Sequence, residues 1–438
     1  MDVYSIISLF GGLALFLYGM HTMSAGLEKL SGSKLQSTLQ KMTAHTSTSL
    51  IFGAAITIAI QSSSALTVML VGLVNSGIMQ LEQTVSVILG GNIGTTLTAW
   101  ILSLSGISGD SIFINLLKPE NFSPIVALIG VIMIMACNTQ KKKDIGGVFV
   151  GFAILMYGMT LMSDSVSPLA DMPEFTGILT AFNNPFLGVL VGLVFTGIIQ
   201  SSAASVGILQ ALSLTGCITY GMAIPLVMGL NIGTCATALL SSIGTTKNAR
   251  RVAIVHITGK IIGTVFCMIV FYGLNAIIGF GFINSPLSAP EVALCHTVFN
   301  IITTIILLPA RKVLIKISRI VVRGNDAKQS EVFLDERLLL SPGLAVHESY
   351  NMAVKMSDIA RSCVLTAMGL MLSYDNDKAA DVKTEETELD MYEDKLGTFL
   401  VKLARKSLSE KDSQEVSKML HTIGDLERLG DHAVNLLR

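Results

Sequence analysis

Long apolar runs dominate the first 310 residues of this 438-residue chain. A helix needs about 20 mostly apolar residues to cross a bilayer. Runs near that length occur at roughly 4–24, 83–104, 123–138, 145–163, 222–243, 252–281 and 291–310. The pattern predicts an all-α protein that crosses a membrane several times.

Two apolar stretches, 46–79 and 185–219, follow a different pattern. Each consists of two arms of about 15 residues that are separated by a polar cluster, Gln61-Ser62-Ser63-Ser64 or Gln200-Ser201-Ser202. One arm is short for a full crossing. We therefore expect each stretch to form a re-entrant helical hairpin, which enters the bilayer, turns at the polar cluster and leaves on the same side.

The chain matches itself at a constant offset of 139 residues. The matched segments include Gln61-Ser62-Ser63 with Gln200-Ser201-Ser202, Asn92-Ile93-Gly94-Thr95 with Asn231-Ile232-Gly233-Thr234, and Thr57 with Thr196. A match without gaps over roughly 90 residues indicates an internal duplication. We expect repeat 1 at about 4–138, repeat 2 at about 145–281 and an extra span at 291–310, all within a transmembrane domain of residues 1–310.

The charges in the loops predict how the repeats are oriented. The loop after the first span carries Lys29, Lys34 and Lys41, whereas the equivalent loop of repeat 2 carries Asp164, Asp171 and Glu174. Basic loops stay on the cytoplasmic side, so the equivalent loops should lie on opposite sides. This predicts inverted repeats in the cell membrane (plasma or inner membrane), with the N-terminus outside and the C-terminal part in the cytoplasm.

The polar clusters have the chemistry of an ion site. Serine hydroxyls and glutamine amides both donate and accept hydrogen bonds, and a helix that starts after the cluster directs free N–H groups at an anion. Glycine in the segments 90–96 and 229–235 permits a local break of a span. A structural alternative remains open, because Ser and Thr in membrane helices often bond to the preceding turn and small residues often serve close packing.

Composition narrows the class of protein. Of all residues 51% are hydrophobic and 14% charged, the mean hydropathy is +0.64 and the net charge is −1. Residues 1–310 hold 21 charged side chains and residues 311–438 hold 40. These values exclude a nucleic-acid binder, a secreted disulfide scaffold and a disordered polymer. Six cysteines without a CxxC pair indicate packed thiols.

The candidate core lacks fixed charge, since the polar clusters contain no Asp, Glu, Lys or Arg. An anion bound there has to arrive with its own cations, which is the physical basis of obligatory symport. An enzyme or ATP-driven pump is disfavoured: the sequence has no G-xxxx-GK-[ST] loop, and the paired serines have no Asp and His partners at a suitable spacing. We expect no resident cofactor in this part.

The twin QSS hairpins and twin NIGT segments resemble the type II sodium–phosphate cotransporter family, in its bacterial form with a PhoU-like tail. The resemblance implies sodium-coupled symport of inorganic phosphate by alternating access. It also implies a phosphate and sodium site lined by Gln61, Ser62, Ser63, Ser64, Asn92, Thr95, Thr96, Gln200, Ser201, Ser202, Asn231 and Thr234.

The chain departs from the family pattern at two places. Ala203 stands where members often keep a third serine of the second hairpin. In a smaller repeat, residues 255–262 match 295–302, and Lys260 stands opposite Asn300 where members usually have Asn. Two interpretations remain open: Lys260 extends to the cytoplasmic face, or its ammonium takes the place of a coupling cation and, together with Asn300, sets the coupling.

The last part of the chain is water-soluble in character. Residues 311–334 form a basic juxtamembrane linker suited to an anionic leaflet, and 335–438 show helical periodicity that resembles a PhoU-like cytoplasmic bundle. Glu427 and Asp431 share one helix face and are candidates for a divalent metal, with an ordinary solvated face as the alternative. The helical pattern still runs at Arg438, which indicates a bundle cut short.

Several functional alternatives remain open at this stage. The carrier can be proton-coupled, carry another oxyanion or export phosphate. From a different class, the chain can be a membrane phosphate sensor without transport. The expected partners are inorganic phosphate, sodium ions and the lipid bilayer, then a second copy in a homodimer and a regulatory protein at the cytoplasmic tail, and no nucleic acid.

Overall fold

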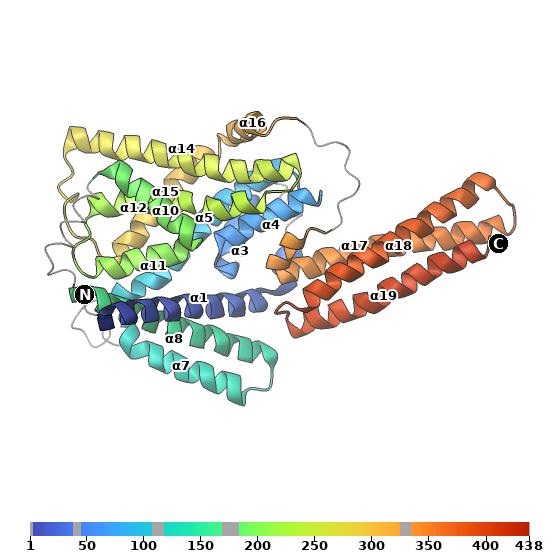
Figure 1. The fold of residues 1–438 in the computed structure, drawn as a ribbon, viewed down its shortest axis with the longest axis horizontal. Helices are drawn as coiled ribbons and strands as arrows, with labels where there is room; N and C mark the ends of the chain where they lie inside the picture. The colour runs from blue at the N-terminus through green and yellow to red at the C-terminus, as the bar shows by residue number, and fades with distance from the viewer. Residues whose placement is uncertain (1–2, 38–44, 107–117, 169–183, 325–333, 438) are drawn as a thin grey trace. The chain divides into compact units, whose positions relative to one another are not determined.

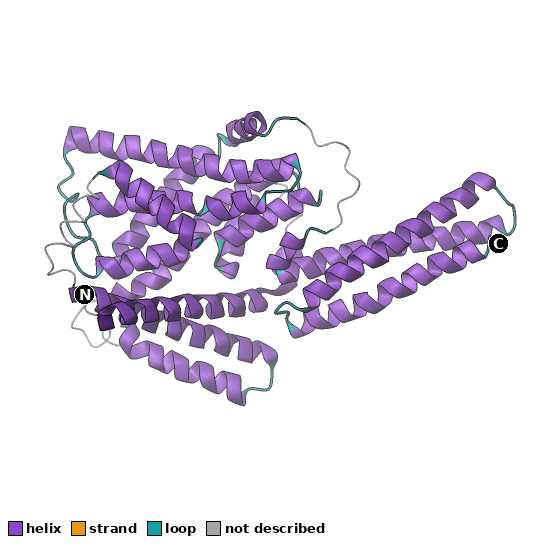
Figure 2. Ribbon diagram, in the orientation of Figure 1, coloured by secondary structure: helices purple, strands orange, loops and turns teal. Residues whose placement is uncertain are grey.

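The computed structural model describes residues 3–37, 45–106, 118–168, 184–324 and 334–437. Within these ranges every named regular element is a helix (Figures 1 and 2), so the all-α prediction is confirmed. The chain divides into one compact unit of Met1–Leu30 with Gln40–Ala327 and a second of Ser31–Leu39 with Lys328–Arg438.

The first unit contains the apolar helices. Their bounds are α1 Val3–Ser37 (in the first unit up to Leu30), α3 Thr46–Ile60, α4 Ser63–Asn75, α5 Leu81–Ser103 with the 3-10 turn Leu104–Gly106, α7 Pro119–Ala136, α8 Gln140–Val166, α10 Pro185–Ile199, α11 Ser202–Ser213, α12 Tyr220–Gly233, α13 Cys235–Ser241, α14 Lys247–Ile278, α15 Ala289–Leu307 and α16 Arg311–Val321.

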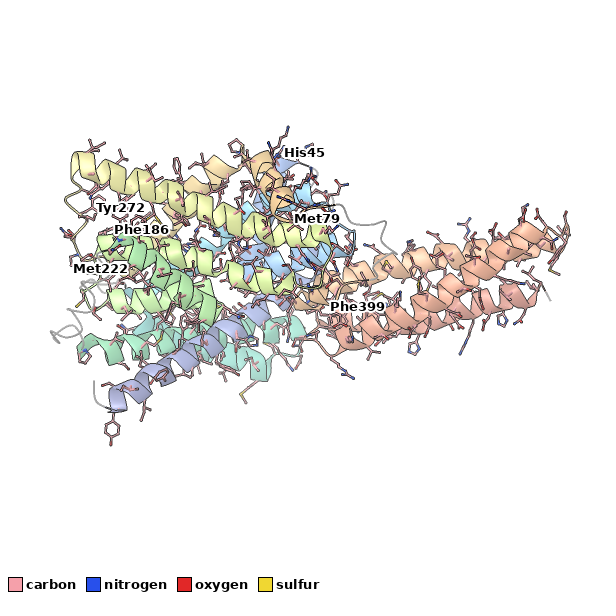
Figure 3. The ribbon with its side chains drawn as sticks, turned by 45° about the horizontal axis from the view of Figure 1, so that its top comes forward. His45, Met79, Phe186, Met222, Tyr272 and Phe399 are labelled. Atoms are coloured by element: carbon pink, nitrogen blue, oxygen red, sulfur yellow. The ribbon has the colours of Figure 1, made fainter. Side chains whose placement is uncertain are left out.

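Among the residues that the structure describes, six helical segments are long and apolar enough to cross a bilayer: Tyr4–Leu30, Leu81–Gly106, Gln140–Val166, Tyr220–Ser241, Lys247–Ile278 and Ala289–Leu307. Large apolar side chains such as Phe186, labelled in Figure 3 and 80% exposed, lie on the outside of this unit. An exposed apolar surface of this extent is stable in lipid and not in water. The protein is therefore a multi-pass membrane protein.

The two polar clusters end one short helix and begin the next. Helices α3 and α10 have 15 residues each, and α4 and α11 have 13 and 12. At 1.5 Å per residue such helices are roughly 20 Å long, which is less than the hydrocarbon core of about 30 Å. The helix–tip–helix pattern that the sequence predicts is present in both repeats.

Glycines let the first arm of each hairpin pack tightly on the following span. A Cβ at Gly90 of α5 would lie 1.9 Å from the Leu50 carbonyl oxygen of α3, and one at Gly229 of α12 would lie 2.1 Å from that of Val189. These contacts are related by the 139-residue offset. Small residues at such crossings allow backbones to approach closely.

The helices that begin the two repeats, α1 and α8, pack against each other. A Cβ at Gly19 would meet the Gly151 carbonyl oxygen at 2.7 Å, and a Cβ at Gly158 would meet that of Gly12 at 2.7 Å. A higher residue number on α1 is therefore paired with a lower residue number on α8. The two helices run antiparallel. Since Gly12 and Gly151 are offset equivalents, as are Gly19 and Gly158, the contact is reciprocal.

The second hairpin arms pack across the two repeats. Helix α4 of repeat 1 contacts α13 and α14 of repeat 2, and α11 of repeat 2 contacts α5 of repeat 1. One buried cluster accordingly joins Phe16 of α1, Leu102 of α5, Leu155 of α8 and Ala204 of α11. The two repeats thus share one core.

The expected breaks at the NIGT segments occur only in repeat 2. Helix α12 ends at Gly233 and α13 begins at Cys235, whereas α5 runs without interruption through residues 90–96. The expectation for repeat 1 was wrong: Gly90 and Gly94 lie inside a continuous helix, where they allow close packing on α3, and a Cβ at Gly94 would lie 2.5 Å from the Ala54 carbonyl oxygen.

In residues 334–437, the second unit contains three long helices, α17 Pro342–Leu370, α18 Asn376–Ala404 and α19 Glu410–Asn435, preceded by a 3-10 turn at Glu336–Leu340. Each of the three helices packs against the other two. Apolar residues at helical spacing, among them Tyr392, Leu396 and Phe399 of α18, fill the interior. This part is a three-helix bundle.

Candidate ion and phosphate site

The hairpin tips are marked by an unusual backbone conformation. Gln61 has φ 58° and Gln200 has φ 57°, and they are the only non-glycine residues with positive φ within the described ranges. Left-handed backbone is costly for a residue with a Cβ, and such outliers concentrate at functional sites. The equivalent strain in both repeats points to a functional role of the tips.

The serine after each glutamine caps the next helix. Ser62 Oγ accepts a hydrogen bond from the Ala65 N–H at 3.1 Å, and Ser201 Oγ accepts one from the Ala204 N–H at 3.2 Å. A cap of this kind satisfies one of the orphan N–H groups and leaves others at the helix start. Each tip therefore presents backbone donors at the positive end of a helix dipole, where an anion binds favourably.

The two tips differ in their surroundings. The buried Gln61 amide donates from Nε2 to the Ile58 carbonyl at 2.6 Å and accepts at Oε1 from the Thr98 hydroxyl at 2.8 Å. Gln200 is exposed, and the equivalent hydroxyl, that of Thr237, donates to the Thr234 carbonyl. The first tip is tied to α5, while the glutamine of the second is more accessible.

A short segment of α5 contacts both hairpins. Thr98 holds the first tip through Gln61. Gln210 of α11 donates to the Ala99 carbonyl at 2.9 Å, and a Cβ at Gly207 of α11 would meet Leu102 Cδ1 at 3.2 Å. Residues 98–102 thus connect hairpins that are far apart in the sequence.

Two buried hydroxyls beneath the tips have no hydrogen-bond partner among the described residues. They belong to Thr57 and Thr196, which are offset equivalents one turn before each tip. Each faces a glycine of the neighbouring span, since a Cβ at Gly91 would lie 2.9 Å from Thr57 Oγ1 and one at Gly233 would lie 2.7 Å from Thr196 Cβ. Unpaired buried hydroxyls are costly, so these two hydroxyls at equivalent positions are candidate ligands.

Sequence reasoning had not included Thr57 and Thr196 among the candidate site residues. The available signal was their match at the 139-residue offset, which sequence analysis used only as evidence of duplication. Their burial and missing partners become visible only when α3 is packed on α5 and α10 on α12.

The threonines of the NIGT segments bond back into their own helices. Thr95 donates to the Gly91 carbonyl at 3.0 Å, Thr96 to that of Ile93 at 2.7 Å and Thr234 to that of Asn231 at 2.6 Å. Such bonds to the preceding turn are what we expect if these threonines serve only the structure of the helix. All three hydroxyl oxygens can still accept or coordinate, since each has used only its donor.

Lys260 does not extend to the membrane surface. Its side chain is buried, with 3% exposure, and Nζ donates to Asn231 Oδ1 at 2.8 Å and to Asn300 Oδ1 at 3.1 Å. The ammonium therefore joins α12, α14 and α15. Of the two interpretations of Lys260, extension to the cytoplasmic face is wrong.

Two histidines at equivalent positions of the smaller repeat lie nearby. His256 and His296 are 2% and 1% exposed, and both interact electrostatically with Lys260. Nδ1 of His256 and both ring nitrogens of His296 have no hydrogen-bond partner among the described residues.

An apolar cavity of about 390 Å³ lies among α12, α14 and α15. Phe266, Phe271 and Phe299 are among its lining residues. It offers no row of donors for an anion, so it does not compete with the tips as a phosphate site.

In the bundle, Asp431 lies in a carboxylate cluster with Glu386 and Asp390 of α18. One oxygen from each of the three lies within 4.8 Å of the others. Oxygen ligands at such spacing suit a hard divalent cation. Burial, with the charges of Asp431, Asp390 and Glu393, raises the pKa of Glu427, which places this side chain beside the cluster.

The partner helix of this cluster was missed in the sequence. The sequence analysis named only Glu427 and Asp431 as metal candidates, whereas the acids that lie beside Asp431 are Glu386 and Asp390 of α18. Both pairs have the spacing i and i+4, which was the available signal.

Comparison with known families identifies the class of protein. The model of the Na+/Pi-cotransporter family matches residues 15–164 and 154–289, and that of the PhoU domain matches 353–438. The chain belongs to the Na+/Pi-cotransporter family and carries a PhoU domain at its C-terminal end. The members of this family are transporters, so the chain is a phosphate-transporter homologue and not an enzyme.

Three relatives illustrate the range of the family. "Uncharacterized protein YqeW" of Bacillus subtilis is 28% identical over 305 residues, which are 69% of this chain and 94% of the relative. "Putative inorganic phosphate export protein YjbB" of Escherichia coli is 22% identical over 434 residues, covering 98% and 76%. Human "Sodium-dependent phosphate transport protein 2B" is 31% identical over 141 residues, covering 32% and 19%. No solved structure matches the chain significantly.

Proposed function

We propose that this protein is a secondary-active symporter that moves inorganic phosphate together with sodium ions by alternating access. The observation that carries the proposal is the pair of equivalent hairpin tips, each with a left-handed glutamine, a serine cap and an orphan threonine hydroxyl. Backbone N–H groups at the tips suit the anion. Hydroxyl and amide oxygens suit sodium.

The proposed site is formed by the candidate residues of the two hairpins and the two NIGT segments. The helix starts at Ser62–Ser64 and Ser201–Ser202 hold phosphate. The oxygens of Gln61, Gln200, Asn92, Asn231, Thr95, Thr96 and Thr234 serve the cations, with Thr57 and Thr196 as additional ligands. Because the tips themselves carry no fixed positive charge, cations that bind with the anion stabilise it there.

Alternating access requires two halves that can exchange roles. The antiparallel, reciprocal contact of α1 with α8 supports inverted repeats, because the first helix of each repeat runs in the opposite direction. Helices α4 and α11, which pack across the repeats, link movement of one half to the other. We place the N-terminus outside and the bundle in the cytoplasm, on the basis of the basic loops.

The similarity to a putative phosphate export protein concerns the net direction in which phosphate moves. The same site can export phosphate, since the gradients of both solutes and the membrane potential set the direction of a symporter. Export through this site requires no further binding residue.

Phosphate flux into proteoliposomes tests the proposal. We expect uptake of radiolabelled phosphate when a sodium gradient is imposed and little uptake when choline replaces sodium. Ser62→Ala and Ser201→Ala should each lower uptake at least tenfold. Ser103→Ala is the control, because the hydroxyl of this buried serine donates to the Trp100 carbonyl within its own helix and caps no helix start.

Two results would overturn the proposal. Phosphate binding without flux would make the protein a sensor. Flux driven equally well by a proton gradient in the absence of sodium would replace sodium with protons, and His256 and His296 would then be the first residues to substitute.

A further inference from the structure

The environment of Lys260 is that of a bound cation. The two Nζ contacts are amide oxygens, Asn231 Oδ1 and Asn300 Oδ1. Both amides are oriented by their own nitrogens: Asn231 Nδ2 donates to the Val227 carbonyl at 2.9 Å, and Asn300 Nδ2 donates to that of His296 at 2.9 Å. Both oxygens are thus directed at one point, where neutral oxygen ligands surround a positive charge.

The charge of this ammonium is not balanced by an acid. Among the ion pairs of the described residues, none joins Lys260 to a carboxylate. Buried charges are normally paired, because an unpaired one is expensive to keep out of water. An ammonium held this way lowers the cost of bringing an anion into its surroundings.

In the described part of the first repeat, the asparagine equivalent to Asn231 is not hydrogen-bonded to a lysine. Asn92 of α5 is the offset equivalent of Asn231 and is also buried. Its amide makes no hydrogen bond to another side chain or carbonyl that the structure describes. The side-chain oxygen of Asn92 in repeat 1 therefore accepts no such bond, whereas the equivalent oxygen of Asn231 in repeat 2 accepts a hydrogen bond from the Lys260 ammonium.

We propose that the Lys260 ammonium is a tethered substitute for one coupling cation. The protein then moves one sodium ion fewer with each phosphate than the same chain with Asn at position 260. This inference rests on the proposed function, and it adds that one positive charge of the site belongs to the protein and stays in place during transport. Asn231 and Asn300 hold it as they would hold a sodium ion.

The test substitutes Lys260→Asn, which restores the residue of the matching position Asn300. In proteoliposomes we expect the sodium-to-phosphate ratio to rise by one ion, with a steeper sodium dependence and one more charge moved in each cycle. Lys406→Asn, an exposed lysine of the tail, is the control and should keep the wild-type ratio. The same ratio in Lys260→Asn and wild type overturns the inference.

A second measurement separates this inference from the proposed function. The melting temperature of purified protein is compared in sodium chloride and choline chloride, without phosphate. We expect Lys260→Asn to gain a sodium-dependent rise that is larger than that of wild type, even if neither protein transports phosphate. An equal rise in both overturns the inference. If Lys260→Asn does not fold, Lys260→Gln serves both measurements with the same expected results.

Discussion

At the scale of single residues, the site combines strain with unsatisfied polar groups. Gln61 and Gln200 adopt left-handed backbone, and the hydroxyls of Thr57 and Thr196 lack partners although they are buried. A protein without a ligand gains nothing from such features, since both cost free energy. Under the proposed function, bound ligands compensate for these costs at the equivalent positions of both repeats.

Removal of an orphan hydroxyl should therefore have opposite effects on stability and on transport. An unpaired buried hydroxyl costs about 1–3 kcal/mol, so Thr57→Val and Thr196→Val should each raise the free energy of unfolding by roughly 1 kcal/mol in sodium-free buffer. Both should lower sodium-dependent phosphate uptake at least tenfold. Thermal melting in choline and flux in proteoliposomes measure the two effects.

Thr84→Val is the control for this pair. Thr84 is also buried, but its hydroxyl donates to the Leu81 carbonyl at 2.7 Å. Its loss should destabilise the protein and leave the sodium dependence unchanged. Unchanged transport in both Thr57→Val and Thr196→Val would show that the orphan hydroxyls are not ligands.

Glu427 provides a residue-scale prediction for the PhoU domain. Burial and the charges of Asp431, Asp390 and Glu393 raise its pKa above the ordinary value of 4.5. The folded bundle therefore binds this proton more tightly than the unfolded chain does. The resulting stabilisation is fully present below pH 4.5 and is lost as the pH rises through the folded pKa.

Hydrogen exchange of α19 in the full-length chain measures this effect. After correction for intrinsic rates, protection should be higher at pH 5 than at pH 7. Glu427→Gln should raise protection at pH 7 and weaken the pH dependence, while Glu415→Gln on the same helix keeps the wild-type behaviour. Lower protection at pH 5 than at pH 7 would contradict the assignment.

At the scale of elements, close helix contacts hold each hairpin on its neighbouring span. A Cβ at Gly192 of α10 would lie 2.4 Å from the Leu226 carbonyl oxygen of α12, whereas one at Gly197 of the same helix meets nothing within 4 Å. The two glycines therefore have different roles although both lie in one apolar helix. The first allows contact, and the second only lowers helix propensity.

Alanine at these two positions should shift stability in opposite directions. Gly192→Ala should destabilise the protein by about 1–3 kcal/mol, because the helices must separate. Gly197→Ala should be neutral or stabilise by up to about 1 kcal/mol through helix propensity. Melting in detergent compares the variants, and equal effects would show that the α10–α12 contact is not tight.

Part of this arrangement was predictable from sequence, and part was not. The hairpins and their tips were predictable, because a polar cluster between two short apolar arms is a local signal in the sequence. The continuity of α5 through residues 90–96 was not, because Gly90 and Gly94 have the same local composition as a helix break. Gly229 and Gly233 make the equivalent contact with α10, yet α12 ends at Gly233, so the difference between the repeats is visible only in the tertiary structure.

At the scale of the whole molecule, the relation between the repeats decides the mechanism. Lys29 and Pro168 are equivalent positions at the offset of 139 residues. In a background in which the native cysteines are replaced, Lys29→Cys should react with an impermeant thiol reagent from the cytoplasmic side, and Pro168→Cys from the opposite side. Labelling of both from one side would show parallel repeats and exclude the inverted arrangement.

The sequence by itself determined the helical membrane class, the duplication and the polar tips, because these follow from hydropathy, a constant offset and local residue order. Only the tertiary structure decided where Lys260 points, which hydroxyls lack partners and that α18 supplies the acids beside Asp431. These features depend on contacts between helices distant in the chain. A lysine in an apolar helix reads the same in sequence whether its ammonium reaches water or two asparagines.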